Sequence, residues 1–314
     1  MTPSFQDLPH GVTRIDTGYL RPGFAACYLL VEAGEAIFIE TGPSLAVPVL
    51  LEVLAHKGLS AESVRGIIVT HVHLDHAGGA ALLMHHLPQA RLLVHPKGLR
   101  HLLDPTKLQA GSEAVYGRER FQSLLGSMHP ADPLRTHSTE DQEIFTLQGR
   151  RLTILHTPGH ALHHQCVWDP ASGGLFTGDA FGISYRIFDR GNERLLFPAT
   201  TPVQFDVQAS HQSLDRLAAL SPAWLFLTHF GPIRFENRLT TQLHTLLDRF
   251  AVLAHDHRHQ TGPEGLTEAL HQLLADELAH SVGSELPPAD CRAWLEMDCT
   301  LNAQGLREWL RRSA

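Results

Sequence analysis

The sequence predicts an α/β fold, because short apolar runs typical of strands alternate with segments of helical periodicity along most of the chain. Strand patterns stop near residue 235, and only helical periodicity follows. The length, 314 residues, suffices for one large α/β domain with or without a smaller appendage. We therefore predict a main domain over residues 1–235 and a small C-terminal helical region over residues 236–314.

The N-terminal part of the chain has the alternation of a sheet followed by a helix and a buried strand. Three apolar runs separated by Gly and Pro predict strands at 11–16, 25–31 and 35–40. Apolar residues at helical spacing predict a helix over 44–56, after the breaker Thr41-Gly42-Pro43. The run 66–70 predicts a buried strand.

The remaining elements follow the same reasoning. Further helices are expected over 78–86, 97–103, 113–125 and 205–220, and further strands over 91–95, 151–155, 165–168, 174–177 and 224–228. The C-terminal region is expected to hold helices over 236–255, 265–280 and 304–312.

Composition limits the classes of function. A hydrophobic content of 43% and a net charge of −8 indicate an ordinary globular protein and argue against a surface built for nucleic-acid phosphates. The four cysteines form no CxxC pair, so no disulfide framework is expected. We expect no signal peptide, because the first residues lack a basic stretch followed by an apolar one, and no membrane span, because no apolar run approaches the roughly 18 residues that span a bilayer. We expect a cytoplasmic protein that acts on a small molecule and binds neither nucleic acid nor membrane.

Three imidazoles and a carboxylate fall within six positions directly after the predicted strand 66–70. They are His71, His73, Asp75 and His76. Imidazole nitrogens and carboxylate oxygens are the ligands of zinc and other first-row divalent ions. Residues that follow a strand lie at the edge of a sheet, where ligands commonly bind.

Three further candidate ligands follow later strands, each near a glycine that permits a tight turn. They are His160 in Pro158-Gly159-His160, Asp179 after Gly178, and His229 before Phe230-Gly231. Taken singly, such residues are more often surface histidines, helix caps or turn residues. Seven of them in this order, each beside a strand end, favour a metal site.

The order H-x-H-x-D-H, Pro-Gly-His, Gly-Asp and a final His resembles the metallo-β-lactamase superfamily, and within it glyoxalase II and related hydrolases. The resemblance covers roughly residues 10–235. It implies an αββα sandwich of two mixed sheets with helices outside, and a binuclear metal site at one sheet edge. It also implies that the first metal takes His71, His73 and His160, the second takes Asp75, His76 and His229, and Asp179 bridges the two.

The expected activity is hydrolysis. Two divalent ions about 3.5–4 Å apart can hold a hydroxide and polarise a substrate oxygen. We expect the metal-bridging hydroxide to attack a thioester, ester or lactone, with Asp75 as the catalytic residue that also orients the hydroxide. We expect two zinc ions, and iron or manganese ions suit the same ligands.

Other histidines receive more ordinary interpretations. We expect His163 and His164 to support the ligands or to point elsewhere rather than to bind metal. The pair His85-His86 is expected on a helix surface, as are His255, His257 and His259.

The long stretch 181–202 directly follows Asp179 and is expected to bind substrate. Its candidate substrate-binding residues are Tyr185, Arg186, Phe188 and Arg190. The alternative is that its arginines pair with Asp189 and Glu193 at the surface.

Two other functions use the same scaffold. One is a phosphodiesterase or nuclease, against which the net acidity counts. The other is a redox enzyme resembling the persulfide dioxygenases, which use a single iron. The sequence leaves open the substrate, the metal, any homo-oligomer, and whether the C-terminal helices contact substrate.

Overall fold

The computed structural model describes residues 3–191, 193–282 and 291–313 and divides into two compact units. The first unit comprises residues up to 156, residues 163–178 and residues 223–233. The second comprises residues 157–162, 179–222 and 234 onward. Strands and helices alternate along the chain, so the predicted α/β class is confirmed. The division into domains at residue 235 stays a prediction.

The first sheet has seven strands in chain order, antiparallel from β1 to β4 and parallel from β4 to β7. The predicted strands of this region are present, and β1 and β7 are additional. The bounds are β1 (Phe5–Asp7), β2 (Val12–Asp16), β3 (Ala26–Glu32), β4 (Glu35–Ile39), β5 (Val64–Ile68), β6 (Arg91–Val94) and β7 (Thr136–Ser138).

The second sheet has six strands in the order β13-β12-β11-β10-β9-β8. Strands β8 to β11 pair antiparallel, and β11 pairs parallel with β12. The bounds are β8 (Ile144–Leu147), β9 (Arg150–His156), β10 (Gln165–Asp169), β11 (Gly174–Gly178), β12 (Trp224–Leu227) and β13 (Ile233–Arg234). Cys166 lies within β10, as predicted, and all four cysteines are free and buried.

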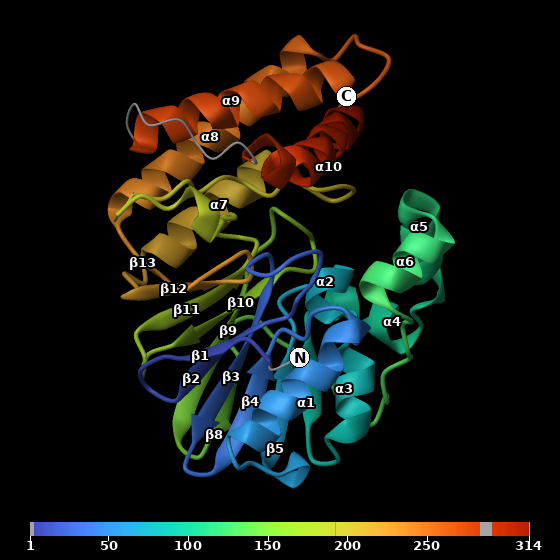
Figure 1. The fold of residues 1–314 in the computed structure, drawn as a ribbon, viewed down its shortest axis with the longest axis vertical. Helices are drawn as coiled ribbons and strands as arrows, with labels where there is room; N and C mark the ends of the chain where they lie inside the picture. The colour runs from blue at the N-terminus through green and yellow to red at the C-terminus, as the bar shows by residue number, and fades with distance from the viewer. Residues whose placement is uncertain (1–2, 192, 283–290, 314) are drawn as a thin grey trace. The chain divides into compact units, whose positions relative to one another are not determined.

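The two sheets of the first unit pack face to face (Figure 1). In their shared core, the ring centroid of Tyr28 on one sheet lies 5.2 Å from that of Phe176 and 5.4 Å from that of Phe226 on the other. The Tyr28 hydroxyl donates a 2.6 Å hydrogen bond to the Leu227 carbonyl, which satisfies its one polar atom inside this core.

Helices cover the other face of the seven-stranded sheet (Figure 1). Helix α1 buries Val47, Leu50, Val53 and Leu54, which recur at the spacing of one helix face. The helices of this unit are α1 (Val47–His56), α2 (Leu74–Ala77), α3 (Ala80–His86), α4 (Pro96–Leu103), α5 (Thr106–Tyr116) and α6 (Arg118–Leu125), with short 3-10 turns η1 (Ser44–Ala46) and η2 (Ala61–Ser63).

One predicted helix is two helices. The sequence indicated a continuous helix over 113–125, but α5 ends and α6 begins at Gly117. Gly117 has a φ of +79°, which lies outside the helical region and suits glycine. The helical periodicity on either side did not reveal this break.

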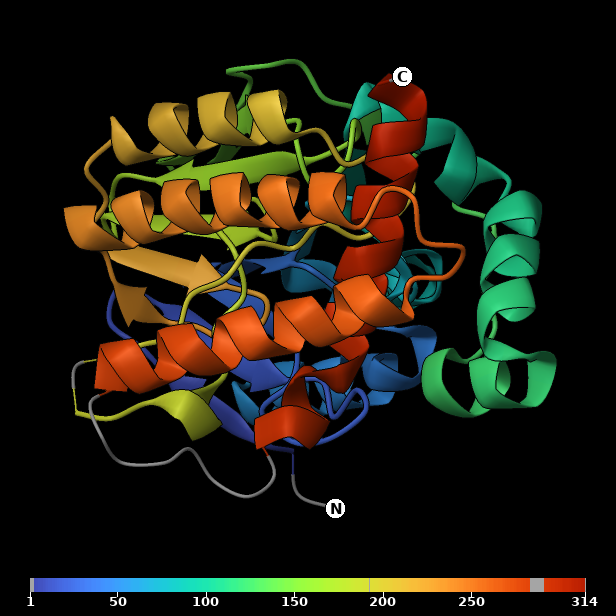
Figure 2. The same cartoon turned by 90° about the horizontal axis from the view of Figure 1, so that it is seen from above.

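The second unit is mainly helical. Helices α7 (Val207–Ala218), α8 (Asn237–Asp256) and α9 (Glu264–Val282) lie in that order, and α10 (Cys291–Ser313) packs across α8 and α9 (Figure 2). In residues 181–191 and 193–202 the named secondary structure is the short 3-10 turn η3 (Arg186–Phe188), with isolated β-bridges between Ile183 and Phe197 and between Arg190 and Glu193. This agrees with the predicted long loop.

Helix α10 begins earlier than the predicted start at residue 304. Its buried residues Leu295, Cys299, Ala303 and Leu306 follow helical spacing across the predicted boundary. No helix among residues 3–191, 193–282 and 291–313 is long and apolar enough to cross a membrane.

Candidate metal centre

Four of the predicted ligands come from the segment that follows β5. The strand ends at Ile68, His71 and His73 lie in the turn after it, and Asp75 and His76 lie on the single turn of α2. His71 and His76 are buried and His73 is half-buried. The end of β5 therefore places all four residues together at one edge of the first unit.

The imidazoles of His71 and His73 converge. Nε2 of His71 lies 2.8 Å from Nδ1 of His73, and the ring centroids are 4.4 Å apart. Nδ1 of His71 lies 3.0 Å from the Thr70 hydroxyl. A neighbouring hydroxyl thus holds one nitrogen of His71, while the other nitrogen faces the second imidazole.

Asp75, His76 and His229 form a second group in the same unit. Each offers one ligand atom, and these atoms lie within 4.8 Å of one another. Oδ2 of Asp75 lies 3.3 Å from Nε2 of His229 and 3.8 Å from Nε2 of His76. The structure therefore brings a residue that follows β12 next to residues that follow β5.

The hydrogen bonds of His229 define which nitrogen is available. Nδ1 of His229 donates a 2.8 Å hydrogen bond to the Phe24 carbonyl, which can only accept. In the neutral imidazole Nε2 then carries a lone pair, and this lone pair faces the Asp75 carboxylate. Two electron-rich atoms 3.3 Å apart require a cation, either a proton or a metal ion, between or beside them.

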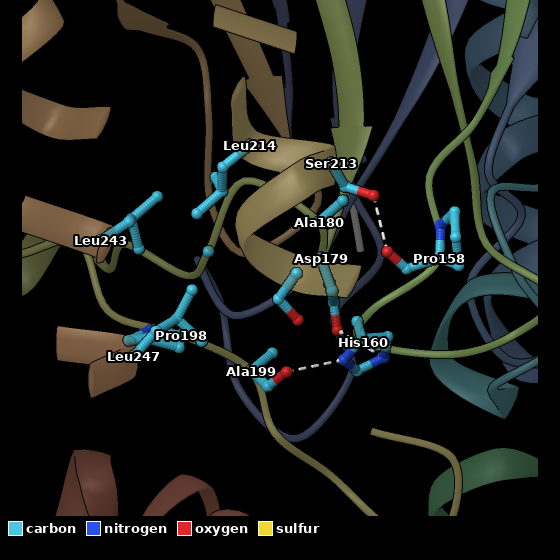
Figure 3. A pocket seen from close by; sticks show the side chains of 12 residues that line it. Pro158, His160, Asp179, Ala180, Pro198, Ala199, Ser213, Leu214, Leu243 and Leu247 are labelled. Carbon is cyan, nitrogen blue, oxygen red and sulfur yellow. Dashed lines mark hydrogen bonds and ion pairs between the residues drawn. The ribbon is translucent and has the colours of Figure 1, made fainter. Parts of the chain in front are cut away.

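The second unit holds the other two predicted ligands, His160 and Asp179, close together. Oδ2 of Asp179 lies 3.5 Å from Nε2 of His160, and both side chains are buried. Nδ1 of His160 donates a 2.9 Å hydrogen bond to the Ala199 carbonyl (Figure 3). His160 therefore repeats the pattern of His229: a carbonyl fixes Nδ1, and Nε2 faces a carboxylate.

Gly159 explains how the backbone brings His160 to this position. A Cβ at Gly159 would lie 2.6 Å from the Cα of Ser210 on α7, and its φ is +145°. Only glycine allows the turn to approach the helix this closely. The Ser213 hydroxyl, one turn along α7, donates a 2.6 Å hydrogen bond to the Pro158 carbonyl (Figure 3).

A small cavity adjoins His160 and Asp179 within the second unit. Its volume of about 20 Å³ accommodates roughly one water molecule. Its other walls are formed by Pro158, Ala180, Gly182, Pro198, Ala199, Ser210, Ser213, Leu214, Leu243 and Leu247 (Figure 3). The cavity is mostly apolar, and its polar groups gather at one end.

His163 and His164 both contact the ligand loop, and their predicted role beside the ligands stays a prediction. The Val72 amide donates a 3.4 Å hydrogen bond to Nδ1 of His163. The His164 ring stacks on His71 with centroids 5.0 Å apart. His85 and His86 are exposed at the end of α3, as expected.

The predicted substrate residues lie in the second unit. The buried Tyr185 hydroxyl donates to the Asp298 carboxylate at 3.1 Å, and Phe188 is also buried. Arg186 donates to Asp189 at 3.1 Å, and Arg190 donates to the carbonyls of residues 187 and 189. The role of these four residues in binding substrate stays a prediction.

The contacts of Asp189 agree with part of the alternative interpretation, in which the arginines of the loop pair with Asp189 and Glu193. It accepts from Arg186 and lies 3.4 Å from Nε of Arg194. Burial raises the pKa of the Asp189 carboxyl, and the hydrogen bond from Arg186 opposes that rise. Arg186 and Arg194 are thus engaged within the loop itself.

Glu40 is a site residue that the sequence analysis missed. It is buried, and its Oε1 lies 3.4 Å from Nδ1 of His76 and accepts from the Thr70 amide at 3.3 Å. Its φ of +68° lies in the left-handed region, which residues with a side chain rarely adopt. The available signal was a carboxylate at the end of an apolar strand, the same signal that identified Asp179.

The donor set suits divalent metal ions. Imidazole nitrogens and carboxylate oxygens meet in both units, and backbone carbonyls or hydroxyls hold the remaining nitrogens of His71, His160 and His229. This is how metal-binding histidines are usually oriented in proteins. The residues therefore fit first-row ions such as Zn²⁺.

Comparison with known families identifies the class of protein. The model of the metallo-β-lactamase superfamily matches residues 20–229, which is more than half of the chain. The chain therefore belongs to the metallo-β-lactamase superfamily, and the predicted resemblance is confirmed.

Individual relatives are moderately similar. A metallo-β-lactamase fold-containing protein of Sulfurisphaera tokodaii is 30% identical over 168 residues, which cover 52% of this chain and 60% of that one. A hydroxyacylglutathione hydrolase of Salmonella typhi is 28% identical over 202 residues, covering 63% and 59%. An atrochrysone carboxyl ACP thioesterase of Aspergillus chevalieri is 29% identical over 154 residues, covering 48% and 38%. The matches thus span about 60% or less of these relatives.

Solved structures share the fold. An archaeal metallo-β-lactamase superfamily protein, ST1585 from Sulfolobus tokodaii, superposes with a TM-score of 0.65 at 23% identity, covering 96% of this chain and all of that one. A metallo-β-lactamase family protein from Thermus thermophilus gives a TM-score of 0.59 at 22% identity, with coverages of 99% and 92%. The predicted metallo-β-lactamase fold is therefore confirmed.

Proposed function

We propose that the protein is a binuclear metal-dependent hydrolase that cleaves a thioester, ester or lactone. The observation that carries this proposal is shared by His229 and His160. In each, a backbone carbonyl accepts from Nδ1, and Nε2 faces a carboxylate within 3.5 Å. Such an arrangement directs a lone pair and a negative charge toward one point, as a metal site requires.

The proposed ligand sets follow the family motif. His71, His73 and His160 would hold the first ion, Asp75, His76 and His229 would hold the second, and Asp179 would contact both. Support for the second set is the mutual approach of its three ligand atoms within 4.8 Å. Support for the first set is the 2.8 Å approach of the His71 and His73 nitrogens.

When bound, two divalent ions lower the pKa of water toward about 7 and polarise the substrate carbonyl. The chain's own residues orient the reactants. We propose that the Asp75 carboxylate, held near Nε2 of His229, accepts a hydrogen bond from the attacking water and aligns it. Glu40 would keep the His76 ring in place through Nδ1.

The substrate class rests on the relatives. One of them is named a hydroxyacylglutathione hydrolase and another an acyl carrier protein thioesterase. A thioester is therefore the first substrate to test, with esters and lactones next. Zinc, a cytoplasmic location and a homo-oligomer stay predictions.

The test combines metal analysis with turnover. Protein purified without added metal or chelator should contain about two ions per chain by elemental analysis. A panel of thioesters, esters, lactones and phosphodiesters then identifies the bond that is cleaved. Asp75→Ala and Asp179→Ala should abolish turnover, whereas Asp276→Ala, at an exposed position on α9, should not.

Three results would contradict the proposal. A single iron per chain without hydrolysis of any panel member would favour a redox enzyme. Retention of most activity in Asp75→Ala would remove the assigned catalytic residue. Cleavage of phosphodiesters alone would show that the substrate is a phosphodiester and not a thioester, ester or lactone.

A further inference from the structure

Helices α7 and α8 carry the same short motif, a histidine followed four residues later by an aspartate. On α7 the pair is His211 and Asp215, and on α8 it is His244 and Asp248. Residues four apart lie on the same face of a helix. Each histidine therefore lies on the same helix face as its aspartate. The two faces meet where α7 and α8 pack together.

The two imidazoles face each other across this helix pair. Their planes are 2° apart, the ring centroids are 4.9 Å apart, and the two Nδ1 atoms lie only 2.6 Å from each other. The side chains are 24% and 26% exposed, so water and ions can reach them.

Carboxylates hold the outer nitrogens in a crosswise pattern. Nε2 of His211 lies 3.1 Å from Oδ1 of Asp248, and Nε2 of His244 lies 3.0 Å from Oδ1 of Asp215. Because an ionised carboxylate only accepts, each Nε2 is the donor and carries a hydrogen. In the neutral rings both Nδ1 atoms then direct lone pairs at each other, an arrangement that a cation between them would relieve.

We propose that His211 and His244 bind one first-row divalent metal ion through their Nδ1 atoms. The site is separate from the seven ligands assigned above. Asp215 and Asp248 would orient the rings, as carboxylates commonly do for metal-bound histidines. Two nitrogens at about 2.0–2.1 Å from a tetrahedral ion lie roughly 3.3 Å apart, so the gap needs to widen by less than 1 Å. Water would fill the remaining positions.

A metal ion bound by His211 and His244 would hold α7 and α8 together. Ser210 precedes His211 and Leu243 precedes His244, and both of these neighbours line the cavity beside His160 and Asp179. An ion shared by the two helices stabilises this helix pair in the folded state by mass action. The site would therefore make the rigidity of the cavity walls depend on the supply of metal.

The experiment adds Zn²⁺ to the full-length protein as purified and measures additional ions bound per chain by equilibrium dialysis with elemental analysis. The wild type should bind one ion that His211→Ala and His244→Ala do not bind. His280→Ala, at an exposed histidine on α9, is the matched control and should behave as the wild type. The wild-type Tm should rise with added Zn²⁺ by more than that of either variant.

A second variant distinguishes the loss of a metal ligand from a folding defect. Asp215→Asn combined with Asp248→Asn keeps both Nδ1 atoms and should weaken this additional binding about 10- to 100-fold. Equal additional binding by the wild type and by properly folded His211→Ala would overturn the proposal. Absence of additional binding by the wild type would do the same.

Discussion

Nδ1 of His76 lies 3.4 Å from Oε1 of Glu40, and both side chains are buried. Glu40 ends the strand segment before Thr41-Gly42-Pro43, 36 positions before His76 in the chain. The sheet brings the two together because β4 and β5 are parallel neighbours, so their ends meet at one edge. Glu40 thus lies beside a predicted metal ligand that follows an adjacent strand.

Glu40→Gln should weaken metal binding about 10- to 100-fold, because the substitution removes the negative charge that orients the His76 imidazole. The measurement is competition for zinc with a chelator of known affinity. Glu35→Gln is the control, since Glu35 lies at the start of the same strand and pairs with Arg65 at 2.7 Å. A loss of stability without a change in zinc affinity would show that Glu40 has a structural role alone.

Gly178→Ala should destabilise the first unit. Gly178 has a φ of +50°, and an added Cβ would lie 2.7 Å from Nε2 of His164 and closer still to the Thr70 hydroxyl. We expect a loss of about 1–3 kcal/mol from overpacking in addition to the backbone cost. Gly23→Ala is the control, because its φ is +75° and an added Cβ would meet nothing within 4 Å. Equal shifts of the denaturation midpoint for the two variants would contradict the steric argument.

Arg150 and Asp169 form a buried, bidentate ion pair between β9 and β10. Nε of Arg150 donates to Oδ1 of Asp169 at 3.0 Å, and Nη2 donates to Oδ2. Asp169→Asn should cost up to about 3–5 kcal/mol of unfolding free energy. The buried guanidinium would then keep only the partly exposed Glu32 carboxylate, 3.4 Å from Nη1, as its charged partner. Chemical denaturation measures this loss.

Two comparisons test that explanation. Replacing both partners, with Arg150→Met and Asp169→Leu, should cost less than Asp169→Asn alone, since no charge remains buried. Glu268→Gln should leave the unfolding free energy nearly unchanged, because Glu268 and Arg292 form a pair that is more than half exposed. A double variant less stable than the single one would refute the account.

His95 should make stability depend on pH. The pKa of His95 is lowered to about 4, mainly by burial and then by the charges of His156 and Lys97, while the charge of Asp141 opposes this shift. Because the folded-state pKa lies below the unfolded value of about 6.5, the unfolded state binds the proton more readily. The contribution of neutral His95 to the free energy of unfolding is therefore fully present above pH 6.5 and is lost as the pH falls toward 4.

His95→Asn should flatten this part of the pH profile. Asn cannot titrate, and its carbonyl can accept the hydrogen bond from the Lys97 amide that Nδ1 of His95 now accepts at 3.1 Å. As the pH falls from 6.5 to 4, the wild type should lose unfolding free energy relative to the variant. The exposed His86→Asn is the control. Parallel profiles for the wild type and His95→Asn would contradict the assignment.

The order of elements was predictable because it rests on local patterns. Strands β2 to β6 and β9 to β12 and helices α1, α7 and α8 lie close to their predicted ranges, since apolar periodicity and Gly or Pro breakers mark them. The additional strands β1, β7, β8 and β13 are short edge or near-edge segments. Their few residues carry too little periodicity to be recognised.

By itself the sequence determined the family and the set of residues placed at strand ends, because both depend on short motifs and local apolar patterns. Only the tertiary structure decided which partners those residues meet. The Phe24 carbonyl that accepts from His229 lies 205 positions away in the chain, and Asp298 lies 113 positions from Tyr185. Contacts over such separations arise when sheets and helices pack, and no local pattern records them.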